Sequence, residues 1–363
     1  MASERTTPSS TLLTPPDATP GTVWIGGAGS GAAGVAGAIQ VGVDATGRRP
    51  SRGERWAVKL NLTYPEYLPG VVNAPRFMQG LCGWARDCGV GIVFIEGDGG
   101  NGTYSADDAF SGNGVHSLVK RYGMACVSLS EEPWEWRETS VRGRTVRLPY
   151  SPFFGRRDYD RLITAPLFKN HVFTVVSLGM KNLWGCIPDA YRMYYHHVLD
   201  AGIVALCKEL RPDFSIFDGL VGLRGRGPMD GKPVEMGAIM VSGGVGAGEA
   251  AALAIMGIPL DRVRHLRLAR EEGLMPSPEE VAWSSAPQPF KRSDFILDRT
   301  WLNHASILLA RMPRLQRLVY HSAFSRLIYA VVNRLRRNSP QAELVRSKLS
   351  KHYSTIGFRG RSQ

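Results

Sequence analysis

Short apolar runs that alternate with helical patterns constrain the fold of this 363-residue chain more than any other feature. Residues 56–62 and 91–95 are compact apolar runs, and residues 75–88 between them have helical spacing. The alternation continues with further apolar runs at residues 125–129, 161–165, 214–217 and 238–242. Strands that alternate with helices form parallel sheets with helices on both faces. We therefore predict an α/β fold with Rossmann-like lobes and mostly parallel strands.

A glycine-rich turn follows the first predicted strand, residues 22–26. It holds four glycines between positions 26 and 31 and leads into a predicted helix that reaches Ile39. The spacing approaches a dinucleotide fingerprint, but no acidic residue closes a second strand about 20 residues later. Small residues that let a helix pack closely on a sheet explain the glycines equally well.

The composition divides the chain into three segments. Residues 1–20 are rich in Ser, Thr and Pro, which predicts a disordered leader. Residues 21–284 carry the alternating pattern and form the body, which is long enough for two lobes with a site between them. Residues 285–363 contain amphipathic helical patterns at 301–311 and 314–337. We expect a basic helical extension in this last segment.

The net charge of +12 belongs to the C-terminal segment. Residues 1–284 contain 29 Lys and Arg against 29 Asp and Glu, whereas residues 285–363 contain 15 against three. A helical extension docked on the body with a solvated basic face is the favoured interpretation. The alternative is a surface helix on anionic lipid, formed by residues 301–351. Nucleic acid is not an expected partner, because no recognised binding module accompanies the charge.

Five cysteines occur, and no two are closer than six residues. Without a C-x-x-C or ferredoxin-type run, we expect no intrinsic iron–sulfur cluster or zinc ribbon. Free thiols in a reducing compartment are the simpler interpretation. The N-terminus lacks the apolar run of a signal peptide, and no run reaches the ~18 apolar residues of a membrane helix. A cytoplasmic location is therefore expected.

Lysines and histidines cluster between residues 169 and 197. This stretch contains Lys169-Asn170-His171, Lys181-Asn182 and His196-His197, although the whole chain has only nine lysines against 35 arginines. An amine with a low pKa can act as a base or nucleophile, and imidazole titrates near neutral pH. The cluster therefore predicts a site of proton transfer, metal binding or covalent chemistry.

Several polar residues follow predicted strands, as in α/β folds whose ligands bind beyond the carboxyl ends of the strands. Glu96, Lys169, Asp218 and the pair 243–244 all lie at such positions. We expect them to share one crevice. The segment 219–231, with Arg224 and Arg226, is predicted either to hold an anion or to be a set of tight turns.

The body resembles the family known as domain of unknown function 362. The blocks that carry this resemblance are Val58-Lys59-Leu60-Asn61, Phe94-Ile95-Glu96-Gly97, Ala165 to His171, Met180-Lys181-Asn182-Leu183-Trp184-Gly185, and Phe217-Asp218-Gly219 through Gly225-Arg226-Gly227-Pro228 and Gly231. Together they cover residues ~20 to ~275. Where the family has a D-P-V-A-V-D-A turn, Gly244 replaces the first Asp and Glu249 replaces the second. The ferredoxin-like cysteine insert of some members is absent from this sequence.

A more distant similarity links the Lys/His cluster to nickel-pincer lactate racemases. The spacings are ten residues from His171 to Lys181 and sixteen from Lys181 to His197. The resemblance implies His171 as acid or base, Lys181 as the point of cofactor attachment and His197 as a metal ligand. The candidate cofactor is then a divalent transition metal. Because His196 and His197 point about 100° apart on a helix, only one can face the site, and the spacing favours His197.

These observations favour an enzyme that performs acid–base chemistry on a small anionic metabolite, such as an isomerase or epimerase. Lys181, His171 and Lys169 are the predicted catalytic residues. The predicted substrate-binding residues are Lys59, Asn61, Glu96, Asn182, Asp218, Arg226 and Gly227. Asp218 is expected to orient a histidine or lysine, and Glu249 to cap a helix. The alternatives are an oxidoreductase or redox partner with an external or bound metal cofactor, and a non-catalytic scaffold at a membrane surface.

Overall fold

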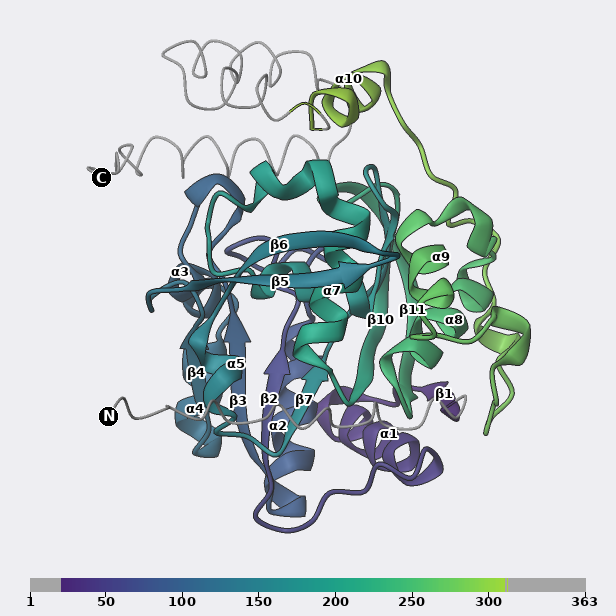
Figure 1. The fold of residues 1–363 in the computed structure, drawn as a ribbon. Helices are drawn as coiled ribbons and strands as arrows, with labels where there is room; N and C mark the ends of the chain where they lie inside the picture. The colour runs from purple at the N-terminus through teal and green to yellow at the C-terminus, as the bar shows by residue number, and fades with distance from the viewer. Residues whose placement is uncertain (1–20, 311, 313–363) are drawn as a thin grey trace, which may run out of the picture.

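The centre of the molecule is a nine-stranded mixed sheet (Figure 1). The computed structural model describes residues 21–310 and residue 312. Seven strands follow the order β1-β11-β10-β7-β2-β3-β4, while β8 pairs with β10 and β9. The strands of this sheet are β1 (Val23–Gly27), β2 (Arg55–Lys59), β3 (Gly91–Glu96), β4 (Ala125–Ser128), β7 (Arg161–Thr164), β8 (Leu167–His171), β9 (Val175–Ser177), β10 (Phe214–Arg226) and β11 (Asp230–Ser242). Five of the strand pairings are parallel and three are antiparallel. The predicted α/β fold is confirmed.

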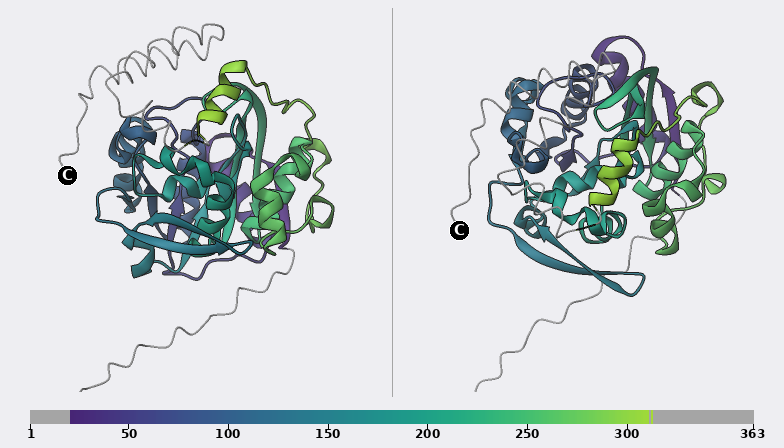
Figure 2. Two further views of the ribbon diagram at one scale, coloured as in Figure 1. Left: turned by 45° about the horizontal axis from the view of Figure 1, so that its top comes forward. Right: turned by 90° about the horizontal axis from the view of Figure 1, so that it is seen from above.

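Helices cover both faces of this sheet (Figures 1 and 2). The α-helices are α1 (Gly31–Ala45), α2 (Pro75–Cys88), α3 (Ala106–Gly112), α4 (Val115–Tyr122), α5 (Pro152–Arg156), α6 (Gly179–Asn182), α7 (Leu199–Leu210), α8 (Val245–Met256), α9 (Arg264–Glu271) and α10 (Trp301–Ala310). Short 3-10 helices are η1 (Gly100–Gly102), η2 (Leu183–Cys186), η3 (Arg192–Val198), η4 (Leu260–Arg262), η5 (Pro278–Glu280) and η6 (Gln288–Phe290). Successive residues of a strand point to opposite faces. Trp56 and Val58 accordingly join the core beneath α1 and α2, whereas Ala57 joins the core beneath α7, α8 and α9.

The strand that leads to the Lys/His cluster is interrupted after β7. Its last residue, Thr164, pairs with Lys59 at the end of β2. After Ala165 and Pro166 the chain continues as β8, which pairs with β10 and β9 instead. The pairing of β2 with β7 therefore ends at Lys59. Beyond this point α6 and η2 pack at the carboxyl end of β2.

The glycine-rich segment 219–231 is part of a long hairpin, and the expectation of a loop there is wrong. β10 and β11 are antiparallel strands of 13 residues each. A Cβ atom on Gly227 would lie 1.8 Å from the backbone oxygen of Asn170, and one on Gly222 would lie 2.9 Å from that of Phe168. The glycines therefore let β8 approach the hairpin closely.

A second, smaller hairpin lies apart from the central sheet. Strands β5 (Glu135–Val141) and β6 (Arg144–Tyr150) pair antiparallel as a separate two-stranded sheet. α7 packs against this hairpin from the body.

Close packing explains the glycines of the first turn. β1 runs antiparallel to β11 at the edge of the sheet, and its neighbour is not β2. A Cβ atom on Gly34 would lie 2.6 Å from the backbone carbon of Gly29, and one on Gly42 would lie 2.5 Å from the Val241 side chain. Because the strand order differs from that of a βαβ dinucleotide unit, the packing explanation is the one supported here.

The C-terminal segment begins as an extended chain on the body. Ser285 Oγ donates to the backbone oxygen of Ile25, and Arg299 donates to that of Val172. The segment then forms α10, which packs against η3. The predicted leader at 1–20 and the predicted helix at 314–337 lie outside the described residues. No helix among residues 21–310 combines the length and the apolar character needed to cross a bilayer.

Candidate functional site

Charged and imidazole side chains from six elements gather beyond the carboxyl ends of the central strands. The charge of Lys59 lowers the pKa of both Lys169 and Lys181, and the charge of Lys181 also lowers that of Lys169. Three imidazoles complete the cluster from β8, η3 and α9. The charged and imidazole side chains of this cluster are Lys59, Glu96, Lys169, His171, Lys181, His196 and His265.

Lys59 and Glu96 form a buried ion pair at the base of the site. Lys59 Nζ lies 2.5 Å from Glu96 Oε1, and the two side chains are 2% and 4% exposed. Lys59 also donates to the backbone oxygen of Leu60, while Glu96 Oε2 accepts from the backbone N–H of Leu62. The pair lies against η2, because a Cβ atom on Gly185 would be 2.9 Å from Lys59 Nζ. Both charges are therefore committed to each other, which differs from their predicted role in substrate binding.

Lys169 is held by neutral acceptors. Its Nζ donates to Asn61 Oδ1 and to the backbone oxygen of Val71, both at 2.9 Å, and it lies 3.5 Å from Thr63 Oγ1. Burial, followed by the charges of Lys181 and Lys59, lowers the pKa of Lys169 to about 7. Lys169 and Asn61 thus join β8 to the segment after β2. Their side chains bind each other here, whereas the sequence predicted a catalytic role for Lys169 and substrate binding for Asn61.

The position of α6 is fixed by buried hydrogen bonds on two sides. Asn182 Nδ2 donates to the backbone oxygen of Lys59 and to Thr164 Oγ1, both at 3.1 Å. On the other side Glu249 Oε1 accepts from the backbone N–H of Met180 at 2.9 Å. The expectation that Glu249 caps a helix is confirmed, since Met180 lies in the first turn of α6. Burial raises the pKa of this carboxyl to about 8.

Lys181 projects from α6 without a counter-ion. Among the described residues its Nζ makes no hydrogen bond or ion pair. It makes a cation–π contact with Trp184, where Nζ lies 5.9 Å from the ring centroid. Burial, followed by the charges of Arg192 and Lys59, lowers its pKa to about 7. A substantial fraction of the amine is therefore unprotonated at neutral pH.

His171 is a hydrogen-bond donor in this geometry. Its Nδ1 accepts from the backbone N–H groups of Phe173 at 3.1 Å and Thr174 at 3.4 Å. Burial and the neighbouring charge of Lys181 keep its pKa well below the usual value, so the ring is neutral. The proton of the neutral ring then lies on Nε2, because Nδ1 is occupied as an acceptor. The predicted role of His171 as a base therefore does not apply to Nδ1, whose lone pair already accepts backbone hydrogen bonds.

His196, and not His197, faces the cluster. The His196 ring packs between Phe173 and Trp184, with centroid distances of 5.2 Å and 5.8 Å. His197 is exposed, and its Nδ1 lies 2.7 Å from the backbone oxygen of Tyr194. The prediction that favoured His197 on spacing alone is wrong, because the His197 ring is exposed whereas the His196 ring packs on Trp184.

Buried ring nitrogens of three side chains complete the inner wall. His265 in α9 is fully buried, and neither ring nitrogen has a hydrogen-bond partner among the described residues. Trp184 Nε1 and His196 Nδ1 are likewise buried and unsatisfied in that part of the chain. Burying a polar group without a partner is costly, so these atoms are suited to receive a ligand or water. His265 carries no local sequence signal, since it comes from a helix 84 residues after Lys181 in the chain.

Arg192 is the cation at the outer edge of the site. Its guanidinium donates to the backbone oxygen of Asp98, which connects η3 to the loop after β3. No described carboxylate lies within ion-pair distance of it. Arg192 therefore keeps guanidinium N–H groups available for an anion.

Asp218 and Arg226 lie outside this cluster, in contrast to their predicted roles. The carboxylate of Asp218 accepts from the backbone N–H groups of Ala74 and Leu220, and burial raises its pKa to about 6. It holds the start of α2 and does not orient a histidine or lysine. The Nε atom of Arg226 lies 3.4 Å from Asp298 Oδ2 and 3.8 Å from Asp230 Oδ2, so the guanidinium charge is already paired. Gly227 serves the close approach to β8 described above.

Within the described residues, no group of three or more His, Cys, Asp and Glu side chains is arranged to hold a metal ion. His197 points away from the cluster, and one nitrogen of His171 is occupied by backbone donors. The residues present thus do not fit the metal site that the racemase resemblance implies. All five cysteines are free thiols, as predicted, and burial raises the pKa of Cys186 beside the site to about 12.

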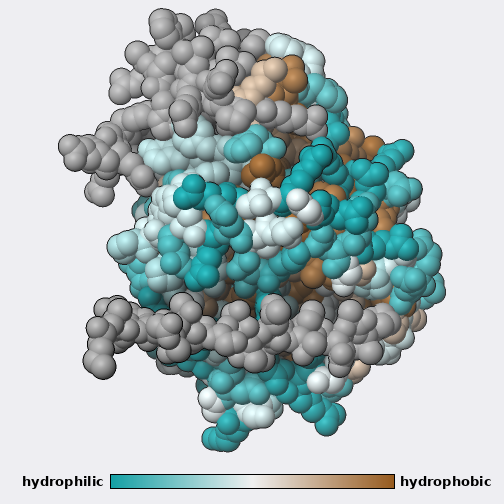
Figure 3. Space-filling view, in the orientation of Figure 1, coloured by the Kyte–Doolittle hydropathy of each residue, from teal (hydrophilic) through white to brown (hydrophobic). Residues whose placement is uncertain are grey.

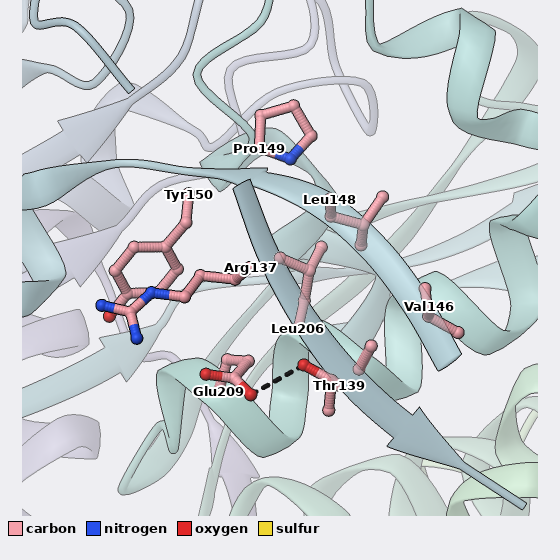
Figure 4. Close-up of a pocket in the computed structure, with 9 residues that line it drawn as sticks. Arg137, Thr139, Val146, Leu148, Pro149, Tyr150, Leu206 and Glu209 are labelled. Carbon is pink, nitrogen blue, oxygen red and sulfur yellow. Dashed lines mark hydrogen bonds between the residues drawn. The ribbon is translucent and has the colours of Figure 1, made fainter. Parts of the chain in front are cut away.

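A surface pocket lies elsewhere, between the β5–β6 hairpin and α7 (Figure 4). Thr139 Oγ1 donates to Glu209 Oε1 across its floor at 2.7 Å, and the Arg137 guanidinium stacks on the Tyr150 ring. None of the residues in the Lys181 cluster lines it. The pocket and the Lys181 cluster are therefore separate places in the fold.

Residues 57–254 match a family whose description is "Domain of unknown function (DUF362)". The match covers more than half of the chain. The chain belongs to the DUF362 family. A thylakoid-associated protein of Synechocystis sp. is 35% identical over 94 residues, which cover 23% of this chain and 29% of that protein. The aligned stretch thus spans less than a third of the relative.

The site explains why DUF362 motifs occur at these positions in this chain. The Lys-x-Asn block supplies Lys59 for the ion pair and Asn61 as the acceptor for Lys169. In the Lys-Asn-Leu-x-Gly block, Lys181 faces the cluster, Asn182 holds α6 in place and Gly185 leaves room for the ion pair. The similarity to lactate racemases remains a prediction.

Proposed function

We propose that this DUF362 protein is an enzyme that removes a proton from a carbon atom of a small anionic metabolite, as isomerases and epimerases do. The observation that supports it is Lys181, an amine with a pKa lowered to about 7 and with no counter-ion in residues 21–310. A general base is most effective when its pKa lies near the working pH. The other two amines of the cluster are occupied, since Lys59 is paired with Glu96 and Lys169 donates hydrogen bonds to Asn61 and Val71.

In the proposed reaction the neutral amine of Lys181 takes a proton from a carbon next to a carbonyl or carboxylate group. The C–H electron pair becomes an enolate, whose charge develops on oxygen, and Lys181 holds the proton as an ammonium. Return of a proton to the opposite face, or to a neighbouring carbon, completes the reaction with no net oxidation. No co-reactant is needed.

The neighbouring donors suit this change of charge. His171 is neutral and carries its proton on Nε2, so it can donate a hydrogen bond to the developing oxyanion. The buried Trp184 Nε1 and the Arg192 guanidinium are donors without a carboxylate partner among the described residues. A substrate carboxylate fits this set, because the donors outnumber the acceptors.

Proton exchange with solvent tests the proposal without knowledge of the product. The protein is incubated in D2O with a panel of small hydroxy, oxo and amino acids, and loss of each C–H signal is followed by proton NMR. We expect at least one acid to exchange. A placed base contributes roughly 10²–10⁴-fold in rate, so Lys181→Met should slow exchange by about that factor.

Lys120→Met is the matched control, because Lys120 is an exposed lysine at the end of α4. It should exchange at the wild-type rate. Undiminished exchange in Lys181→Met would refute the role of Lys181, and a wild-type protein that exchanges no acid of the panel would count against the proposed reaction.

A further inference from the structure

Exposed apolar side chains concentrate on one short stretch near the described end of the chain. Seven large hydrophobic residues are exposed among the described residues, and four of them fall between positions 296 and 312. They are Ile296 at 72%, Trp301 at 68%, Leu308 at 59% and Met312 at 47% exposure. Scattered single apolar residues need no explanation, but such a concentration marks an interaction surface.

Two of these exposed residues, Trp301 and Leu308, form a face of α10. Trp301 and Leu308 are seven residues apart, which is two helical turns, so they lie on the same side of the helix, with exposed Ala305 between them. The buried Ala310 lies on a different side, and the helix packs against η3. Figure 3 shows apolar side chains at the molecular surface of α10.

The charge of the sequence that follows indicates the partner. Residues 311–363 contain 12 Lys and Arg and one Glu. An apolar helix face with a tryptophan, next to a strongly basic stretch, is the combination that binds anionic lipid surfaces. A soluble apolar partner would explain the exposed face but not the charge that accompanies it.

We propose that the exposed face of α10 docks on the surface of an anionic lipid bilayer. Trp301 and Leu308 insert among the headgroups, and the basic residues beyond position 310 interact with the lipid phosphates. Because α10 packs on η3, which carries His196 and Arg192, docking places the membrane beside the Lys181 site. This proposal is independent of the reaction proposed above.

Vesicle flotation of the full chain tests it. We expect binding to vesicles of phosphatidylcholine with phosphatidylglycerol and much weaker binding to phosphatidylcholine alone. Removing two inserted side chains in Trp301→Ser/Leu308→Ser should lower the partition coefficient by at least about tenfold. Binding of the wild type should also weaken when salt is raised from 0.1 to about 0.5 M, because surface charge is screened.

Val41→Ser/Trp136→Ser is the matched control, since it removes an exposed aliphatic and an exposed tryptophan from other surfaces. It should bind like the wild type. The proposal is overturned if the wild type binds neither kind of vesicle, if it binds both equally, or if the α10 double variant binds as well as the control. Dimerisation through α10, lost in the same double variant without any vesicle binding, would also overturn it.

Discussion

The buried ion pair between Lys59 and Glu96 allows a prediction with a defined magnitude. In Glu96→Gln the ammonium of Lys59 stays buried without a counter-charge, and neutral oxygens such as the backbone oxygen of Leu60 are the acceptors that remain to it. Removing one partner of a buried pair costs about 3–5 kcal/mol, because an uncompensated charge is left in the interior. Domains of this kind have total stabilities of roughly 5–15 kcal/mol, so the loss should be easy to measure.

The assay is urea unfolding of four proteins: wild type, Glu96→Gln, Lys59→Met and the double variant. The double variant contains no unpaired buried charge, so its loss of stability should be well below the sum of the two single losses. Asp87→Asn is the control, because it breaks the exposed Arg86–Asp87 pair and should cost about 0–1 kcal/mol. A loss for Glu96→Gln as small as that of the control, or additive losses in the double variant, would refute the reasoning.

Three further predictions concern the neighbours of this pair. Gly185→Ala should lower stability by about 1–3 kcal/mol in urea unfolding, because its Cβ would lie 2.9 Å from Lys59 Nζ, and an unchanged midpoint would contradict the packing. Lys169→Met should cost roughly 2–4 kcal/mol, since it leaves buried acceptors unpaired, and wild-type stability would argue against the network. Burial raises the pKa of Glu249 from 4.5 to about 8, so the wild type should lose stability as pH rises between these values, whereas Glu249→Gln should lose less. Parallel pH profiles of unfolding for the two proteins would contradict the burial of an uncharged carboxyl.

The parts of the fold that follow from local patterns could be predicted. Apolar runs of five to seven residues placed β2, β3 and β7 in a parallel sheet, since strands buried on both faces are apolar nearly throughout. The long hairpin of β10 and β11 could not be foreseen from its many glycines. Gly222 and Gly227 are required by the close approach of β8, a contact between residues about 55 positions apart.

The site followed the sequence only in part. Clustering of rare lysines drew attention to Lys181, but it could not separate an amine without a partner from Lys169, whose acceptor Val71 lies 98 residues away. The choice of His197 over His196 depended on spacing alone, and spacing does not indicate which of two adjacent rings is exposed. His265 reaches the site through packing of α9, which no local pattern indicates.

The central claim, that Lys181 is a neutral amine at physiological pH, can be measured directly. Amine labelling at a series of pH values, read at each lysine by mass spectrometry, gives the apparent pKa of Lys181 beside exposed Lys120 in the same sample. We predict that labelling of Lys181 reaches its half-maximum near pH 7, as its pKa of about 7 requires, and well below that of Lys120. A Lys181 that titrates together with Lys120, near the usual lysine pKa of about 10.4, would contradict the account.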